Sequence, residues 1–135
     1  AIDAFCERTG QEKPENDAQV IRLIFESLAL RYRQVLEDLD RIATHPIERL
    51  HIIGGGSKNR LLNQLTANAI GRKVIAGPSE ATAIGNVMIQ AMAAGVVSSL
   101  QEMRSIIHAS VETEEFVPEL VAEWEEAYQK FVTLK

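Results

Sequence analysis

The stretch that most constrains the fold of this chain is residues 50–71, which read LHIIGGGSKNRLLNQLTANAIG. A short apolar run precedes three glycines and three polar residues, which are Gly54, Gly55, Gly56, Ser57, Lys58 and Asn59. A pattern of leucines typical of a helix follows them. This order predicts a strand, a tight glycine turn and a helix. Because glycine has no Cβ and the first N–H groups of a helix lack internal partners, a flat or anionic small molecule would fit against this turn.

The rest of the chain predicts further helices and one more strand. Helices are expected over residues 1–9, 17–43, 59–70, 80–94, 100–109 and 120–134, where apolar residues recur at helical spacing. Asp17 and Ser79 are expected to cap two of these helices, and Gly71 is expected to end another. Strands are expected over residues 47–53 and 73–76, whereas residues 112–118 are expected to form an acidic connector.

The predicted strands indicate an α/β fold that is larger than this chain. Two strands joined through a helix form a right-handed crossover and lie parallel to one another. A parallel sheet needs more than two strands and cover on both faces. Since the chain also starts at Ala1 rather than at Met, we expect the other strands of the sheet to precede Ala1.

Composition excludes several classes of function. The 135 residues suffice for one domain, and 14 Lys and Arg against 19 Asp and Glu give a net charge of -5. This charge and an aromatic content of only 5% argue against a nucleic-acid surface. No apolar run approaches the roughly 20 residues of a membrane span. The single cysteine, Cys6, excludes an internal disulfide and fits a reducing compartment, so we expect a cytoplasmic protein that contacts neither nucleic acid nor membrane.

No set of residues in the sequence indicates catalysis or metal binding. The three histidines are scattered along the chain, and they are His45, His51 and His108. They offer no pair at one-turn spacing, so no metal site is predicted. Cys6 and Trp124 are expected to be buried apolar residues. The aspartates fall on helices rather than at strand ends, and we therefore expect no catalytic residue in this chain.

The glycine turn departs from the common phosphate-binding motifs. A dinucleotide fingerprint would need glycine where Asn59 stands, and a Walker loop would need Gly-Lys-Ser or Gly-Lys-Thr at its end. Ser57 and Asn59 also suit the capping position of a helix. The residues alone therefore leave two interpretations open, a nucleotide-binding turn and a purely structural turn.

The sequence from Ile52 to Gly95 resembles the C-terminal domain of the FGGY carbohydrate kinases. The motif GGGSKN is shared by many sugar kinases, whereas VIAGPSEATAIGN together with NRLLNQLTANAIG is more specific. The upstream AIDAFCERTGQEKPEN and the downstream EMRSIIHASVETEEFVPE extend the resemblance. It covers nearly the whole chain and is weakest after about Leu120.

This resemblance implies the actin-like ATPase architecture, in which two ribonuclease-H-like domains enclose a cleft. Residues 1–135 would be the later part of the C-terminal, nucleotide-binding domain, and the N-terminal sugar-binding domain would be absent from this chain. ATP and magnesium would be the cofactors. Gly55 would lie against the nucleotide and Asn59 near the adenine, while Gly54, Gly56 and Ser57 would shape the turn. The catalytic aspartate, most of the magnesium environment and the sugar pocket would precede Ala1.

Similarity within the family favours L-rhamnulose, phosphorylated at O1, as the sugar. L-fuculose, xylulose and glycerol remain alternatives, because the sugar pocket is not expected in this chain. We expect the chain alone to be inactive as a kinase. Two other classes stay open, a non-catalytic nucleotide-binding module and a helical interaction module that dimerises through residues 17–43.

Overall fold

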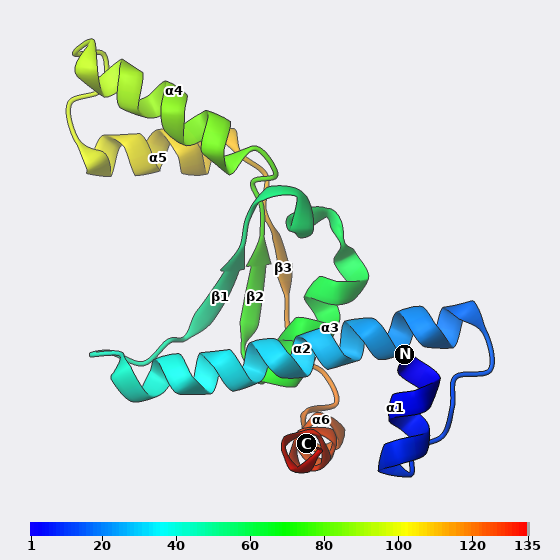
Figure 1. The fold of residues 1–135 in the computed structure, drawn as a ribbon. Coiled ribbons are helices and arrows are strands. Elements are labelled where there is room, and N and C mark those ends of the chain that lie inside the picture. The colour runs from blue at the N-terminus through cyan, green and yellow to red at the C-terminus, as the bar shows by residue number, and fades with distance from the viewer. Residues whose placement is uncertain (135) are drawn as a thin grey trace.

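The computed structural model describes residues 1–134, and Lys135, the last residue of the predicted domain, lies outside the described part. Within this part the chain forms α-helices, short strands and one 3-10 helix (Figure 1), in the order α1 (Ile2–Thr9), α2 (Asp17–Ile42), β1 (Arg49–Ile52), η1 (Gly54–Lys58), α3 (Arg60–Ile70), β2 (Lys73–Ala76), α4 (Ala81–Ala93), α5 (Leu100–Ser110), β3 (Glu114–Phe116) and α6 (Val121–Thr133). The predicted α/β class, with few strands and several helices, is confirmed.

The strands form one small mixed sheet in the order β1-β2-β3. Strands β1 and β2 are parallel, as predicted, and Leu50 lies opposite Val74. Strand β3 runs antiparallel to β2 and places Phe116 opposite Val74. The prediction of a connector over residues 112–118 is therefore wrong. Glutamates disfavour strands, and β3 forms because Phe116 is buried and Glu115 pairs with Lys73 at 2.6 Å.

Two of the predicted helix caps are also wrong. Asn16, not Asp17, caps α2, because its side chain accepts a hydrogen bond from the Gln19 N–H at 3.0 Å. Helix α4 starts after Glu80 without a side-chain cap, so Ser79 does not have the predicted role. The predicted end of α3 is confirmed, since Gly71 has a left-handed backbone with φ 63°.

Helix α3 is the centre of the core. One apolar cluster joins α2, α3 and α6, and its buried members are Ala29, Leu30, Leu65, Ala69, Trp124 and Tyr128. A second cluster joins α2 and α3 to the sheet, and its buried members are Leu36, Ala67, Ile70, Val74, Ala76 and Phe116. The predicted burial of Trp124 and of Cys6 is confirmed.

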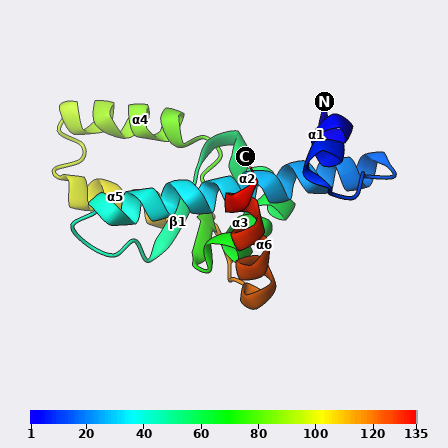
Figure 2. The same cartoon turned by 60° about the horizontal axis from the view of Figure 1, so that its bottom comes forward.

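Helices α4 and α5 form a hairpin that projects from this body. Figure 1 shows both helices beyond the ends of the strands, and Figure 2 shows the same hairpin extending to one side of the molecule. Its own small cluster consists of Met88, Val97 and Met103, with partly buried residues around them. The hairpin thus has a core separate from that of the body.

Candidate functional site

The glycine stretch lies between the end of β1 and the start of α3. It forms the 3-10 helix η1 rather than the predicted tight turn, because Gly54 takes a left-handed backbone with φ 75° and redirects the chain. The Gly54 N–H donates to the Pro78 carbonyl at 3.0 Å, and the Gly77 N–H donates to the Ile52 carbonyl at 2.8 Å. The loops that follow the two parallel strands are therefore joined into one corner at the carboxyl end of the sheet, the place where α/β folds bind ligands.

The surface over the first two glycines is open. A Cβ built on Gly54 or Gly55 would meet no atom within 4 Å, and one on Gly56 would meet only the Ile52 side chain at 3.8 Å. Among the described residues nothing therefore prevents a side chain at Gly55, whose φ also lies outside the left-handed region. The fold itself therefore does not require glycine at position 55. Close approach of a ligand to the backbone would explain why glycine is there.

Ser57 and Asn59 have different roles at the corner. The Ser57 hydroxyl donates to the Gly54 carbonyl at 2.7 Å and so closes η1. Asn59 caps α3, since its Oδ1 accepts from the Leu62 N–H at 3.1 Å. The Asn59 Nδ2 has no hydrogen-bond partner within residues 1–134. The predicted capping role of Asn59 is thus confirmed, and the predicted capping role of Ser57 is wrong. The Asn59 side chain keeps one N–H donor that could bind a ligand.

Asn63 belongs to the corner although the sequence did not indicate it. This residue is fully buried, and its Nδ2 donates to the Ser57 carbonyl at 2.8 Å. Its Oδ1 is buried and has no partner among the described residues. The only sign in the sequence that Asn63 belongs to the corner is its position one helical turn after Asn59. Its burial could not be predicted, because the burial of a polar helical residue depends on the elements that pack around it.

One cation of the corner is free and a neighbouring one is paired. Arg60 donates from Nε to the Glu114 carboxylate at 2.9 Å, so this side chain is neutralised by β3. Lys58, at the end of η1, is exposed and forms no ion pair within the described part of the chain. A positive side chain beside helix N–H groups would favour an anionic ligand.

The sequence predicted no site residue beyond those of the corner. Within residues 1–134 no three His, Cys, Asp or Glu side chains come together as a metal site, and the absence of a metal and of a catalytic residue stays a prediction. His51 is exposed on β1, and Cys6 is buried in α1. None of the helices in the described range combines the length and the apolar character that crossing a membrane requires.

The fold and the corner define a class of protein, an α/β domain with a glycine-rich site between a parallel strand and the following helix. Comparison with known proteins gives the family. Residues 1–94 match the C-terminal domain of the FGGY family of carbohydrate kinases, and the chain belongs to this family. The family predicted from the sequence is therefore confirmed.

Several relatives in this family are rhamnulokinases. The chain is 57% identical over 131 residues to rhamnulokinase of Bacteroides thetaiotaomicron, and the alignment covers 97% of this chain and 27% of the relative. It is 44% identical over 117 residues to rhamnulokinase of Klebsiella pneumoniae, and this alignment covers 87% of this chain and 24% of the relative. The chain thus spans about a quarter of the length of the curated relatives it matches.

A solved structure supports the fold. The chain resembles the crystal structure of xylulose kinase from Rhodospirillum rubrum with a TM-score of 0.70 and 25% sequence identity. The match covers 93% of this chain and 25% of the xylulose kinase. The neighbour is a sugar kinase of the predicted fold class.

Proposed function

We propose that this chain forms the adenine-nucleotide-binding part of an ATP- and magnesium-dependent kinase that phosphorylates L-rhamnulose at O1. The observation that carries the proposal is the open glycine corner of η1 and α3 in a chain of a carbohydrate-kinase family. The choice of sugar follows from the rhamnulokinase relatives, because no residue of this chain is assigned to a sugar pocket. The cytoplasmic location predicted from composition belongs to the same proposal.

The residues of the corner fit a nucleotide. The Gly55 backbone is open to a flat ligand, and the free Nδ2 of Asn59 is placed to donate to an acceptor nitrogen of an adenine ring. Gly54, Gly56 and Ser57 give η1 its shape, and Lys58 offers a charge to an anionic group.

This chain would bind and orient the nucleotide, and it would not perform the chemistry alone. Phosphoryl transfer depends on positioning and on stabilisation of charge by groups on both sides of the transferred phosphate. ATP supplies the phosphoryl group. We assign the general base, the sugar pocket and most of the magnesium environment to the part of the kinase fold that this chain does not contain.

The first test is a titration of the isotope-labelled chain with a non-hydrolysable ATP analogue and magnesium, followed by NMR. We expect shifts over residues 54–59, and we expect Gly55→Ala to weaken binding by about tenfold while leaving the fold intact. The matched control is Gly85→Ala in α4, where an added Cβ also meets nothing within 4 Å. Equal affinity of the two variants would contradict the assignment of Gly55.

The second test separates the two roles of Asn59. Asn59→Asp keeps an oxygen for the helix cap and removes the Nδ2 donor, so nucleotide affinity should fall by about 1 kcal/mol with little loss of stability. Asn59→Ala removes both groups. The control Asn16→Ala deletes the cap of α2 and should leave affinity unchanged. If Asn59→Asp binds the nucleotide as tightly as the parent, Asn59 does not contact the adenine.

The kinase assignment is tested in a chimera in which this chain replaces the matching quarter of the Bacteroides relative, which then supplies the sugar pocket. We expect the chimera to phosphorylate L-rhamnulose, and we expect Gly55→Ala to weaken its binding of ATP. A folded chimera that neither binds the nucleotide nor phosphorylates L-rhamnulose would contradict the assignment of this chain to a rhamnulose-specific kinase.

A further inference from the structure

Asn63 is a polar side chain in the interior of the domain, and its N–H donor is committed to the glycine corner. The residue lies in the first turn of α3 and is 0% exposed, so a ligand on the surface of the corner does not touch it. Its Nδ2 donates to the Ser57 carbonyl at 2.8 Å. This hydrogen bond ties the last turn of η1 to the first turn of α3 from the buried side, whereas the surface over Gly54 and Gly55 is open.

The shape of η1 depends on three hydrogen bonds at different points. The Gly54 N–H donates to the Pro78 carbonyl at 3.0 Å and fixes the start of η1. The Ser57 hydroxyl donates to the Gly54 carbonyl at 2.7 Å and lies within η1. The bond from Asn63 fixes the end of η1. Because Ser57 lies between the two proposed nucleotide contacts in the chain, its position sets how these contacts are placed relative to one another.

The same side-chain amide leaves a second polar atom without a partner. The Asn63 Oδ1 is buried and accepts no hydrogen bond from any residue in the described part of the chain. A buried acceptor in this state lowers stability, because its hydration is lost and not replaced. An apolar side chain of the same branched shape would avoid this loss, so stability alone does not explain the amide. Local features that lower stability are expected at functional sites.

We propose that Asn63 is a positioning residue of the nucleotide corner. It holds the Ser57 carbonyl, and through it η1, so that the Gly55 backbone and the Asn59 Nδ2 contact one nucleotide at the same time. Two contacts that are already in place bind more tightly than two that must be ordered on binding. Asn63 itself touches neither the nucleotide nor a reacting atom. This inference rests on the proposed function of the corner.

Thr66 provides a matched comparison in the same helix. It is also 0% exposed, and its hydroxyl donates to the Leu62 carbonyl at 2.7 Å. This bond lies within α3 and does not reach η1. Thr66→Val and Asn63→Leu therefore each replace one buried polar side chain of α3 by an apolar side chain of the same branched shape, and only Asn63→Leu removes a bond to the corner.

The test is a titration of each variant with a non-hydrolysable ATP analogue and magnesium, together with urea denaturation of the same samples. We expect Asn63→Leu to weaken binding by about tenfold, because η1 is no longer held at its end. Its urea midpoint should stay close to that of the parent, because the unsatisfied acceptor is removed together with the donor. Thr66→Val should bind the nucleotide like the parent.

Kinetics of the chimera with the Bacteroides relative separate positioning from a merely structural role. Asn63→Leu should raise the KM for ATP by about tenfold and leave kcat and the KM for L-rhamnulose unchanged, because the lost binding is equal in the ground state and the transition state. A variant that is only less well folded would instead lower kcat through a smaller active fraction and keep the parent KM for ATP.

Two outcomes overturn the proposal. One is equal nucleotide affinity of Asn63→Leu and Thr66→Val, and the other is a lowered kcat of the Asn63→Leu chimera with an unchanged KM for ATP. If Asn63→Leu does not fold, Asn63→Ser takes its place, because the shorter side chain stays polar and no longer reaches the Ser57 carbonyl. The same loss of affinity is expected for Asn63→Ser, and parent affinity overturns the proposal.

The Gly55→Ala variant separates this inference from the proposed function. If Gly55→Ala weakens binding and Asn63→Leu does not, the positioning role of Asn63 is wrong and the proposed function stands. If neither variant weakens binding, the corner is not the nucleotide site, and the proposed function fails together with this inference.

Discussion

The body around α3 and the α4–α5 hairpin are built from similar helices with different burial. In α3 every residue of the range 65–70 is buried, because α2, the sheet and α6 surround the helix. In the hairpin only Met88, Val97 and Met103 are buried, while Val87 is 64% and Val96 75% exposed. Helical periodicity therefore predicts that a helix forms, and it does not predict how much of that helix the fold covers.

This difference has a consequence for local stability. A segment with few buried contacts opens more easily than the core to which it is attached. We therefore expect substitutions in the body to change the unfolding of the whole chain, and substitutions in the hairpin to change the opening of the hairpin.

The largest effect is expected for Leu65→Ala in α3. Leu65 is 5% exposed and belongs to the cluster that joins α2, α3 and α6. Loss of this side chain should lower the free energy of unfolding by about 2–5 kcal/mol, because it leaves a cavity in the core. Urea denaturation measures this change. Leu61→Ala is the control on the same helix, since Leu61 is 50% exposed and should cost far less. Equal losses would show that α3 is not the centre of the core.

A smaller and local effect is expected for Met103→Ala in α5. Met103 packs with Met88 and Val97 and with no cluster of the body. Hydrogen exchange should become faster over residues 81–110, by about 2 kcal/mol in the local opening free energy, while residues 60–70 keep their protection. A uniform increase over both ranges would show that the hairpin and the body unfold together.

The parts of the fold that the sequence predicted depend on local signals. The bounds of α3 were predicted within one residue, because its apolar spacing, the Asn59 cap and the Gly71 end all lie in one short stretch. Strand β3 was not predicted, because it exists only through its pairing with β2, about 40 residues away in sequence. The position of the α4–α5 hairpin beyond the ends of the strands was likewise not predicted, because it depends on contacts between elements and not on a local pattern.

The candidate site also has features that the sequence predicted and features that it did not. The stretch from Gly54 to Asn59 was predicted from composition and order, but its 3-10 helix was not. The helix begins at the left-handed backbone of Gly54, whose N–H donates to the carbonyl of Pro78 in the loop after β2, and this contact is not visible in the local sequence. The role of Asn63 was also missed. Its burial results from packing of α3 against α2 and the sheet, which no local pattern encodes.

The helix caps provide a third comparison between body and hairpin. Asn59 caps α3, and Ser99 caps α5 by accepting from the Glu102 N–H at 3.1 Å. Asn59→Ala should lower the free energy of global unfolding by about 1 kcal/mol. Ser99→Ala should leave the urea midpoint unchanged and only speed exchange over residues 100–110. A global loss for Ser99→Ala as large as that for Asn59→Ala would remove the distinction between the two regions.

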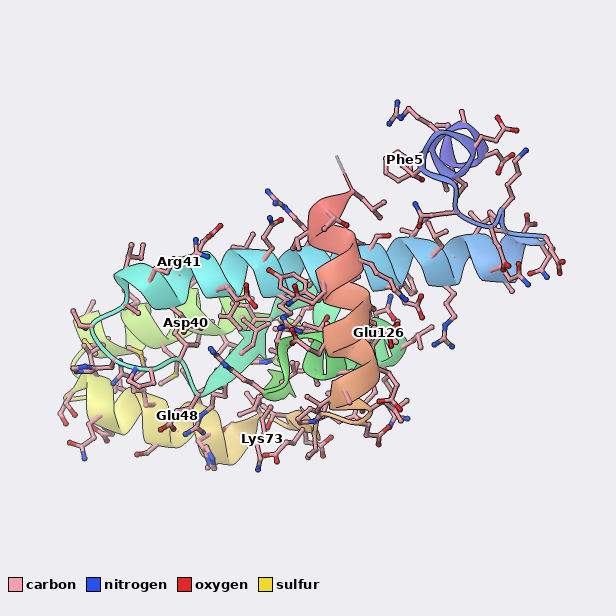
Figure 3. All side chains as sticks on the ribbon, turned by 90° about the horizontal axis from the view of Figure 1, so that it is seen from below. Phe5, Asp40, Arg41, Glu48, Lys73 and Glu126 are labelled. Atoms are coloured by element: carbon pink, nitrogen blue, oxygen red, sulfur yellow. The ribbon has the colours of Figure 1, made fainter. Side chains whose placement is uncertain are left out.

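The smallest effect concerns acid, and it again separates the two regions. In the body, hydrogen bonds from the Arg72 guanidinium at 2.6 and 3.1 Å lower the pKa of Asp40, which lies near the C-terminal end of α2 (Figure 3). In the hairpin, hydrogen bonds from Ser98 lower the pKa of Glu102. A lowered pKa in the folded state stabilises the chain above the ordinary value, and that stability is lost as the pH falls through the folded pKa.

Asp40→Asn should therefore flatten the loss of global stability below about pH 4, the ordinary range of an aspartate, and should have little effect on its slope at neutral pH. Urea midpoints collected from pH 7 to pH 2.5 measure this slope. Glu102→Gln should leave the global slope unchanged, because the hairpin carries little of the cooperative core, and should reduce only the acid-induced exchange over residues 98–110. If Glu102→Gln flattens the global slope as much as Asp40→Asn does, the hairpin unfolds as part of the body, and the separation seen in the packing does not extend to the energetics.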